Sequence, residues 1–280
     1  MTEISAALVK ELREETNAGM MECKRALTEA NGDKAKALRI LRERGIAIAQ
    51  KKSSRTANQG LIASFISGDG RAGSLIEVNC ETDFVAKNAG FQAFAAKLAE
   101  EAIALDGSLA EAAKTEVTAK VAEIGENIVV RRNMRFVLQK SGLIASYIHH
   151  GATIGVLLEI NCGKSETATQ DGFKELAKDI CLHIAASSPR FLDRSSVPAE
   201  VVASEREIFA KQVTGKPPQI IEKIVDGKMG KFYEQNCLIE QPFVKDQDKK
   251  IAALLKEKCS ALADEVKIAR FARFQVGEVL

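Results

Sequence analysis

Cysteines and histidines are the side chains of this chain that could act as nucleophiles, general bases or metal ligands. The sequence holds six cysteines and three histidines. No two cysteines form a CxxC pair, and with so few histidines a zinc site lacks its usual ligand spacing. The sequence therefore predicts no metal site and no cofactor, and the cysteines are expected to stay reduced. They are Cys23, Cys80, Cys162, Cys181, Cys237 and Cys259.

Two glycine-containing stretches share features with nucleotide-binding loops. GDGRAG at 68–73 has the spacing GxGxxG, but a dinucleotide site needs that pattern between a strand and a helix. Here the flanking patterns both predict strands, so this stretch is expected to be a hairpin loop. TGK at 214–216 lacks the glycine of a phosphate-binding loop, because Ala210 stands five residues before Gly215. The chain is therefore not expected to bind a nucleotide itself.

An internal repeat is the most informative feature of the sequence. Residues 61–100 repeat at 143–182 with a constant offset of about 82 residues, and about 14 of the 40 positions are identical. LIASFI matches LIASYI, and SLIEVNC matches VLLEINC. Each copy has β-branched runs bounded by glycine and then a long helical pattern, which predicts strand, turn, strand, loop and helix. Two copies with so long a period indicate duplicated subdomains.

The loop after the second strand of each copy is where the two copies differ. The first copy continues ETDFVAKN at 81–88, and the second continues GKSETATQ at 163–170. Phe84 corresponds to Glu166, so the scaffold does not require an aromatic residue at this position. Phe84 either staples the loop to the following helix or is an exposed anchor for a partner's pocket. Truncating such an anchor typically costs ~2 kcal/mol or more of binding free energy.

Features that both copies share are expected to be structural. Cys80 and Cys162 both follow an asparagine at the end of a strand, which indicates small apolar packing residues. A thiol or acid–base enzyme that uses Cys80 with a histidine is the alternative, but Cys162 would then need the same chemistry in a different loop. His183 falls within a helical pattern and is expected to be a structural residue.

Length and composition are those of an ordinary globular protein. The 280 residues suggest about two domains, and 46% apolar and 28% charged residues are typical of this class. The net charge of +2 does not predict the basic patch of a nucleic-acid or anionic-membrane binder. No stretch approaches the roughly 20 apolar residues of a membrane-spanning helix, and MTEISAALVKELREE resembles neither a signal nor a transit peptide. We expect a cytoplasmic protein with no membrane or direct nucleic-acid partner.

The N-terminal 45 residues predict a small module of three helices. Apolar residues at helical spacing favour helices over 4–15 and 21–30. Asp33 is a plausible N-cap for a third helix that reaches Gly45. Residues 46–59 are polar and unpatterned and predict a linker. At least one of Met20 and Met21 is expected in the core of this module.

The remaining elements complete a predicted α+β fold. A helix near 108–125 and a strand near 127–138 follow the first copy, giving a core N-subdomain over 60–140. The core C-subdomain over 141–280 contains an inserted helical hairpin at about 190–235, with helices at 199–212 and 218–231 joined by a short turn containing Gly215 and Lys216. A helix near 248–264 and a strand near 266–276 close the chain. The hairpin either pairs two copies of the protein in a homodimer or packs alone.

Three stretches in order along the chain resemble the elongation factor Ts family. They are LVKELREETNAGMMECKRAL at 8–27, ETDFVAKN at 81–88 and IGENIVVRR at 124–132. The resemblance extends over nearly the whole chain. It implies an N-terminal domain of the ubiquitin-associated type, a duplicated α+β core and a helical dimerisation insert.

The resemblance also implies a function, which is guanine nucleotide exchange on the GTPase elongation factor Tu during protein synthesis, without catalytic residues of its own. In the family, the TDFV segment disturbs the magnesium site of the GTPase, and it corresponds here to Thr82, Asp83, Phe84 and Val85. Further contacts carry over to Leu12, Arg13, Gly19, Met20 and Met21. An interface histidine of the second-copy hairpin corresponds to either His149 or His150. The alternative is a ubiquitin-associated-type adaptor without exchange activity, which would leave most of the chain unexplained.

Overall fold

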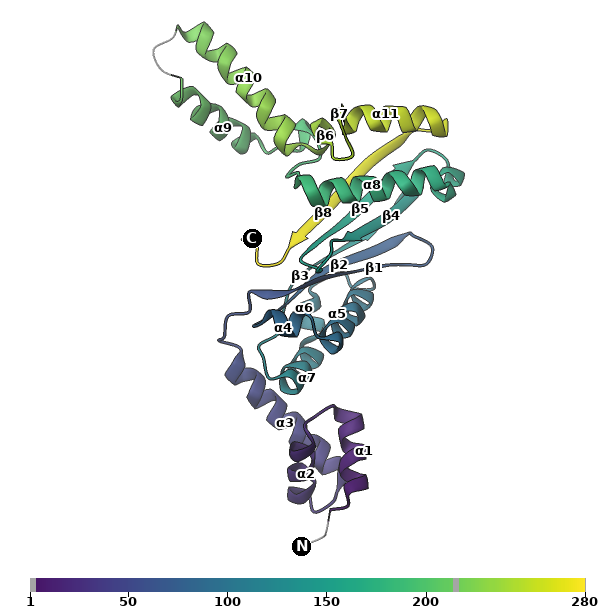
Figure 1. The fold of residues 1–280 in the computed structure, drawn as a ribbon, viewed down its shortest axis with the longest axis vertical. Helices are drawn as coiled ribbons and strands as arrows, with labels where there is room; N and C mark the ends of the chain where they lie inside the picture. Colours follow the sequence, from purple (N-terminus) through teal and green to yellow (C-terminus); the bar gives the residue numbers. More distant parts are fainter. Residues whose placement is uncertain (1–3, 214–216, 280) are drawn as a thin grey trace.

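The computed structural model describes residues 4–213 and 217–279. The molecule is elongated, with a helical module at the N-terminal end, two sheets with their helices in the middle, and a helical hairpin at the far end (Figure 1). Helices and strands are both present in each half of the core, which confirms the predicted α+β class.

The N-terminal module consists of α1 (Ala6–Thr16), α2 (Met20–Glu29) and α3 (Lys34–Lys52). Ser5 and Asp33 cap α1 and α3, each accepting a hydrogen bond from a backbone N–H three residues on, as such N-caps do. The apolar residues recur three or four positions apart, so one stripe of each helix faces a shared core. The buried residues of this core are Val9, Leu12, Cys23, Ala26, Leu27, Ala30 and Ala37.

The third helix is longer than predicted, and residues 46–52 of the predicted linker are helical. Gly45 indicated a helix end, but here it lies against α7 (Lys114–Ile124). A Cβ at Gly45 would be 3.4 Å from the Cβ of Ala122. That distance is an ordinary van der Waals contact, so Gly45 lies within the helix and does not end it. The helix continues past Ala49, which packs against the first-copy core.

Each repeat contributes a hairpin and a third strand to an antiparallel sheet. The first sheet has the order β1 (Gln59–Ile66), β2 (Ala72–Cys80), β3 (Val129–Val137). The second has the order β4 (Gly142–Ile148), β5 (Ile154–Cys162), β8 (Val266–Gln275). The predicted loop at 68–73 joins β1 to β2, which confirms the hairpin.

The third strands of the two sheets are also equivalent. Glu77 pairs with Arg132 in the first sheet and Glu159 with Arg270 in the second, and a bulge follows each glutamate. The guanidinium of Arg132 stacks on the Phe274 ring at 4.0 Å, and that of Arg270 stacks on Phe136 at 4.3 Å. The duplication therefore includes a third strand that the constant offset of the sequence repeat did not reveal.

The two sheets lie against each other (Figure 1), and equivalent residues of the two copies meet between them. The hydroxyl of Ser64 donates to its counterpart Ser146 at 3.0 Å. Gly73 and Gly155 are equivalent positions where an added Cβ would crowd three side chains, one from the same sheet and two from the other. Their lack of a side chain thus allows the close approach of the sheets. The core between the sheets contains Ile62, Leu75, Phe136, Leu138, Ile144, Leu157, Ala272 and Phe274.

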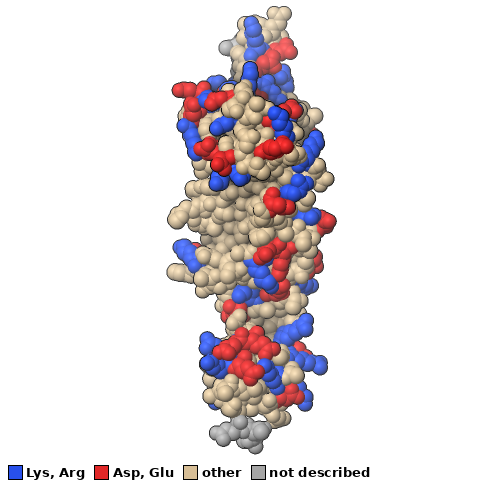
Figure 2. Space-filling view, turned by 90° about the vertical axis from the view of Figure 1, so that its right-hand side faces the viewer, with Lys and Arg blue, Asp and Glu red and all other residues tan. Residues whose placement is uncertain are grey.

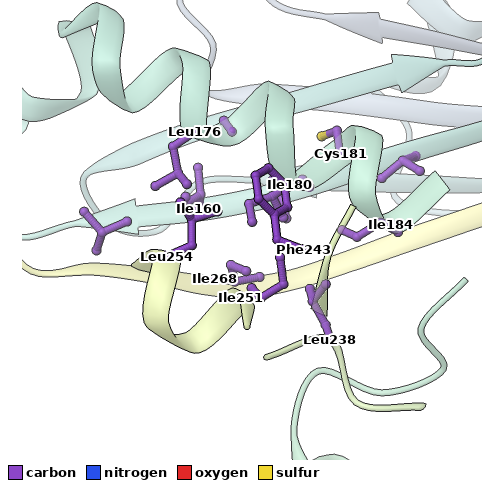
Figure 3. Close-up of a cluster of buried hydrophobic side chains, with 14 of the residues drawn as sticks. Ile160, Leu176, Ile180, Cys181, Ile184, Leu238, Phe243, Ile251, Leu254 and Ile268 are labelled. Atoms are coloured by element: carbon purple, nitrogen blue, oxygen red, sulfur yellow. The ribbon is translucent and has the colours of Figure 1, made fainter. Parts of the chain in front are cut away.

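Helices cover the outer face of each sheet. α5 (Ala89–Ala102) packs on the first sheet and α8 (Asp171–Ser187) on the second. The helix predicted near 108–125 is divided at Ala113 into α6 (Leu109–Ala112) and α7. In the second copy, apolar side chains of α8, β5 and α11 (Ile251–Leu262) point toward one another (Figure 3) and form a buried cluster with Leu238 and Phe243.

The hairpin consists of α9 (Ala199–Lys211) and α10 (Pro218–Asn236), and α10 continues beyond the predicted end at 231. The predicted turn residues Gly215 and Lys216 lie outside the described residues. The short strands β6 (Pro242–Phe243) and β7 (Asp246–Lys250) follow, and α11 then begins later than predicted. The sequence DQDKK of β7 has no apolar alternation, so its pattern does not predict a strand.

Candidate partner-binding site

Phe84 is exposed at the surface of the first copy. Its side chain is 82% accessible, and it lies on the short helix α4 (Asp83–Ala86) directly after β2. The neighbouring Val85 and Ala86, not Phe84, pack against the first-copy core. The interpretation of Phe84 as a staple is therefore wrong, because an exposed ring holds no loop in place. A large exposed aromatic side chain without an internal packing role is typical of a partner-binding anchor.

Thr82 and Asp83 organise the first turn of α4. Thr82 is the N-cap, and its hydroxyl accepts a hydrogen bond from the Val85 backbone N–H at 3.3 Å. The Lys87 ammonium donates to the Asp83 carboxylate at 2.7 Å, and this contact holds the pKa of Asp83 below its usual value. Asp83 is therefore a carboxylate at neutral pH, on the same exposed turn as Phe84.

A surface hollow joins α4 to the β4–β5 turn of the second copy. It has a volume of about 400 Å³, and its lining includes Asp83 and Lys87 on one side and Gly151 and Ala152 on the other. The Ile62 N–H of β1 donates to the Ala152 carbonyl at 2.7 Å, which fixes the turn against the first sheet. Residues of the two copies, far apart in the sequence, thus border one surface.

The two candidate histidines lie on this β4–β5 turn. Both His149 and His150 are exposed, and the Tyr147 hydroxyl is 3.1 Å from the Nδ1 atom of His149. His149 is therefore oriented by a neighbour near the end of β4. The turn borders the hollow beside α4 through Gly151 and Ala152, and the choice between the two histidines stays open.

The N-terminal candidates form a second exposed region on α1 and α2. Met20 and Met21 are 46% and 61% accessible, so the expectation that one of them lies in the core is wrong. Arg13 and Gly19 are also exposed. Leu12, by contrast, is fully buried in the module, and a partner cannot contact its side chain without unpacking the helices. We retain the four exposed residues as the N-terminal part of the candidate site.

The cysteine environment is unfavourable for thiol chemistry. Cys80 and Cys162 are buried, as expected for packing residues, and each Sγ donates to a carbonyl two residues on. Burial raises the pKa of Cys80 to about 11, which leaves almost no thiolate at neutral pH. In the part of the chain that the structure describes, no group of three or more histidine, cysteine, aspartate or glutamate side chains could hold a metal ion.

His183 is a structural residue, as predicted. Its ring is buried in α8, with Nε2 2.9 Å from the Gln241 side-chain oxygen, and Nδ1 accepts from the Val244 N–H. With Nδ1 as an acceptor, the ring is neutral, and burial lowers its pKa. The ring joins α8 to the segment that follows the hairpin.

The surface charges are mixed in sign. Lys and Arg are mixed with Asp and Glu over most of the face shown in Figure 2, and only a patch in its middle, toward the left of the view, carries few charges. Among residues 4–213 and 217–279, no helix is both long and apolar enough to cross a membrane.

A large exposed aromatic side chain on a capped turn is typical of proteins that bind another protein. The Elongation factor TS family model matches residues 81–278. An elongation factor Ts of Nitratidesulfovibrio vulgaris (strain DP4) is 42% identical over 277 residues, which cover 98% of this chain and 96% of the relative. Those of a Nitratiruptor species and of Clostridium botulinum (strain Eklund 17B / Type B) are 45% and 44% identical, covering 98% of this chain and 93% of each relative. The chain belongs to the elongation factor Ts family.

Proposed function

We propose that this protein is a guanine nucleotide exchange factor that binds elongation factor Tu in its GDP-bound form and promotes release of GDP, so that GTP can bind. The observation that carries the proposal is the exposed Phe84, 82% accessible at the tip of a capped turn. Membership of the elongation factor Ts family supports the identity of the partner.

Phe84 acts as a wedge in this proposal. A translation GTPase holds GDP through phosphate contacts and a Mg²⁺ ion that bridges protein and phosphate oxygens. Because Mg²⁺ requires near-ideal octahedral geometry, a displacement of its supporting residues by about 1 Å weakens the whole site. Burying the Phe84 ring in the partner contributes ~1.5–3 kcal/mol, which stabilises a GTPase conformation with a distorted metal site.

Asp83 supplies a negative charge beside the wedge. Its ion pair with Lys87 is exposed and spans one helical turn, and such exposed pairs contribute little to stability because water screens them. The partner can therefore separate the two side chains at little cost. Asp83 then competes either for water near the metal or for backbone donors around the phosphates, and the choice between these roles stays open.

The remaining candidate residues contribute affinity. Arg13, Gly19, Met20 and Met21 form one contact region on the N-terminal module, and the turn with His149 and His150 forms another beside α4. The hairpin of α9 and α10 has exposed apolar side chains, Ile208 and Ile220, and pairing of two copies through it remains a prediction. We propose that the protein acts in the cytoplasm, without a cofactor, without direct contact to nucleic acid and without a membrane.

Release of fluorescent GDP from purified elongation factor Tu tests this function. Excess unlabelled GDP is added with and without the protein, and the release rate is followed over time. We expect the protein to raise this rate by at least about tenfold, in keeping with typical coupling between two binding sites. By linkage, GDP should weaken the binding of the protein to elongation factor Tu by the same ratio by which the protein weakens the binding of GDP. An unchanged release rate over a titration to saturation would leave only shared ancestry with the family and would contradict the proposal.

A further inference from the structure

The backbone that leads into α4 is held by one carboxylate from a distant part of the chain. Glu126 lies between α7 and β3, and one of its oxygens accepts from the backbone N–H groups of Glu81 at 3.0 Å and Thr82 at 3.1 Å. The other oxygen accepts from the Thr82 hydroxyl at 2.7 Å. We call these three hydrogen bonds the Glu126 clamp.

The clamp determines how Thr82 caps α4. A hydroxyl has one proton and two acceptor lone pairs. Because the proton of Thr82 is donated to Glu126, a lone pair remains to accept from the Val85 N–H at 3.3 Å. Glu126 thereby orients the capping hydroxyl of the turn on which Phe84 lies.

A second carboxylate, that of Glu81 in the loop before α4, binds the segment that contains Glu126. Glu81 accepts from the Asn127 backbone N–H at 2.7 Å, and this bond is the main cause that lowers the pKa of Glu81. The Asn127 side chain donates to the Arg55 carbonyl at 2.7 Å, and the Arg55 guanidinium is 3.3 Å from Glu81. The start of the loop is therefore joined both to the segment before β3 and to the chain that follows α3.

In the second copy a carboxylate also holds the equivalent loop, with a different set of donors and without the aromatic residue. Asp264, before β8, accepts from the Lys164 N–H at 2.9 Å and from the Thr167 hydroxyl at 2.6 Å. The loop that it holds carries Glu166 at the position equivalent to Phe84. A carboxylate just before the third strand therefore holds the loop in both copies, and only the first copy combines it with an exposed aromatic side chain.

We propose that Glu126 is a positioning residue for nucleotide exchange, holding α4 so that Phe84 is already in its binding orientation before the partner arrives. This proposal rests on the proposed exchange function. A pre-ordered turn contributes to binding because less conformational freedom is lost on association. Glu126 acts through Thr82 and does not itself need to touch the GTPase.

Four variants test the proposal in the GDP-release assay: Glu126→Ala, Glu126→Gln, Phe84→Ala and the double variant Glu126→Ala with Phe84→Ala. Hydrogen bonds to a charged group are among the stronger ones, so we expect Glu126→Ala to lower the maximal release rate about tenfold. The glutamine oxygen can still accept from both backbone N–H groups, so Glu126→Gln should lose about threefold or less. In the Phe84→Ala background, Glu126→Ala should add less than about twofold, because coupled residues are not additive.

Asp264→Ala is the matched control, since it removes the equivalent clamp from the copy without an aromatic residue. It should lower thermal stability about as much as Glu126→Ala while leaving the release rate within about twofold of the native protein. The proposal would be overturned if Glu126→Ala released GDP at the native rate. It would also be overturned if Glu126→Ala still lowered the release rate tenfold in the Phe84→Ala background.

Amide hydrogen exchange tests the positioning role of Glu126 independently of the proposed nucleotide-exchange function. In the free protein, Glu126→Ala should speed exchange of the Val85 amide by about tenfold, and Asp264→Ala should leave it unchanged. If the native protein fails to release GDP, the exchange function is wrong, yet this measurement still decides whether Glu126 orders the turn. Unchanged Val85 exchange in Glu126→Ala would refute the positioning role.

Discussion

Replacing Phe84 with alanine is expected to reduce the protein's acceleration of GDP release by about thirtyfold or more, corresponding to the ~2 kcal/mol or more of an interface anchor. The stability of the free protein should change by less than about 0.5 kcal/mol, because the ring is 82% accessible and contributes nothing to the core. Release kinetics and chemical denaturation of the same preparation measure the two quantities.

The second copy provides the control for Phe84. Glu166→Ala alters the equivalent position on the other clamped loop and should leave the release rate unchanged. If Phe84→Ala released GDP as fast as the native protein, the binding energy would lie elsewhere, and the N-terminal residues Met20 and Met21 would be the next to replace.

Replacing Gly155 with alanine should destabilise the fold by about 3 kcal/mol, at the upper end of the cost of overpacking. An added Cβ would overlap Ile62 Cγ2 and would lie 2.9 Å from Ile148 Cδ1 and 3.0 Å from Leu75 Cδ1. Two of these atoms belong to the opposite sheet, so relief requires the sheets to separate. Denaturant unfolding monitored by circular dichroism measures the effect.

Gly73→Ala should behave alike, because Gly73 occupies the equivalent position and a Cβ there would meet Ile66 Cδ1 at 2.6 Å and Ile144 Cγ2 at 2.7 Å. Gly227→Ala is the matched control. It adds the same methyl group to an exposed helical position with no atom within 4 Å, and it should stabilise the protein by about 0.5–1 kcal/mol. A loss below about 0.5 kcal/mol in both sheet variants would show that the sheets do not pack as described.

The parts of the fold that could be predicted are those with an internal reference or a local pattern. The repeat at constant offset indicated both hairpins and the helices that follow them, since identical stretches such as LIAS leave little freedom in strand assignment. Asp33 was recognised as a cap from its own position. The offset failed for β3 and β8 because the hairpin of α9 and α10 lies between the second copy and its third strand, and a gapless comparison cannot follow such an insertion.

The parts that could not be predicted depend on contacts between distant segments. Gly45 indicates a helix end by its intrinsic preference, whereas in the structure it lies inside α3 and faces α7. Met20 and Met21 are apolar and begin a helix, which favours a place in the core. In the structure Leu12, Leu27 and their neighbours occupy that core, and both methionines are exposed. Glu126 gave no signal of its own within IGENIVVRR, because its three donors belong to a segment far away along the chain.

The central claim, that the protein releases GDP by disturbing the Mg²⁺ site, is tested most directly by removing the metal. GDP release from elongation factor Tu is measured with and without the protein, first in millimolar Mg²⁺ and then in excess chelator. If the protein acts on the metal site, the chelator alone should speed release, and the further acceleration by the protein should fall to a few-fold, because the contacts that it disrupts are already lost. An acceleration of the same size in both conditions would contradict the account, and the action of the protein would then have to lie on the base or ribose side of the nucleotide.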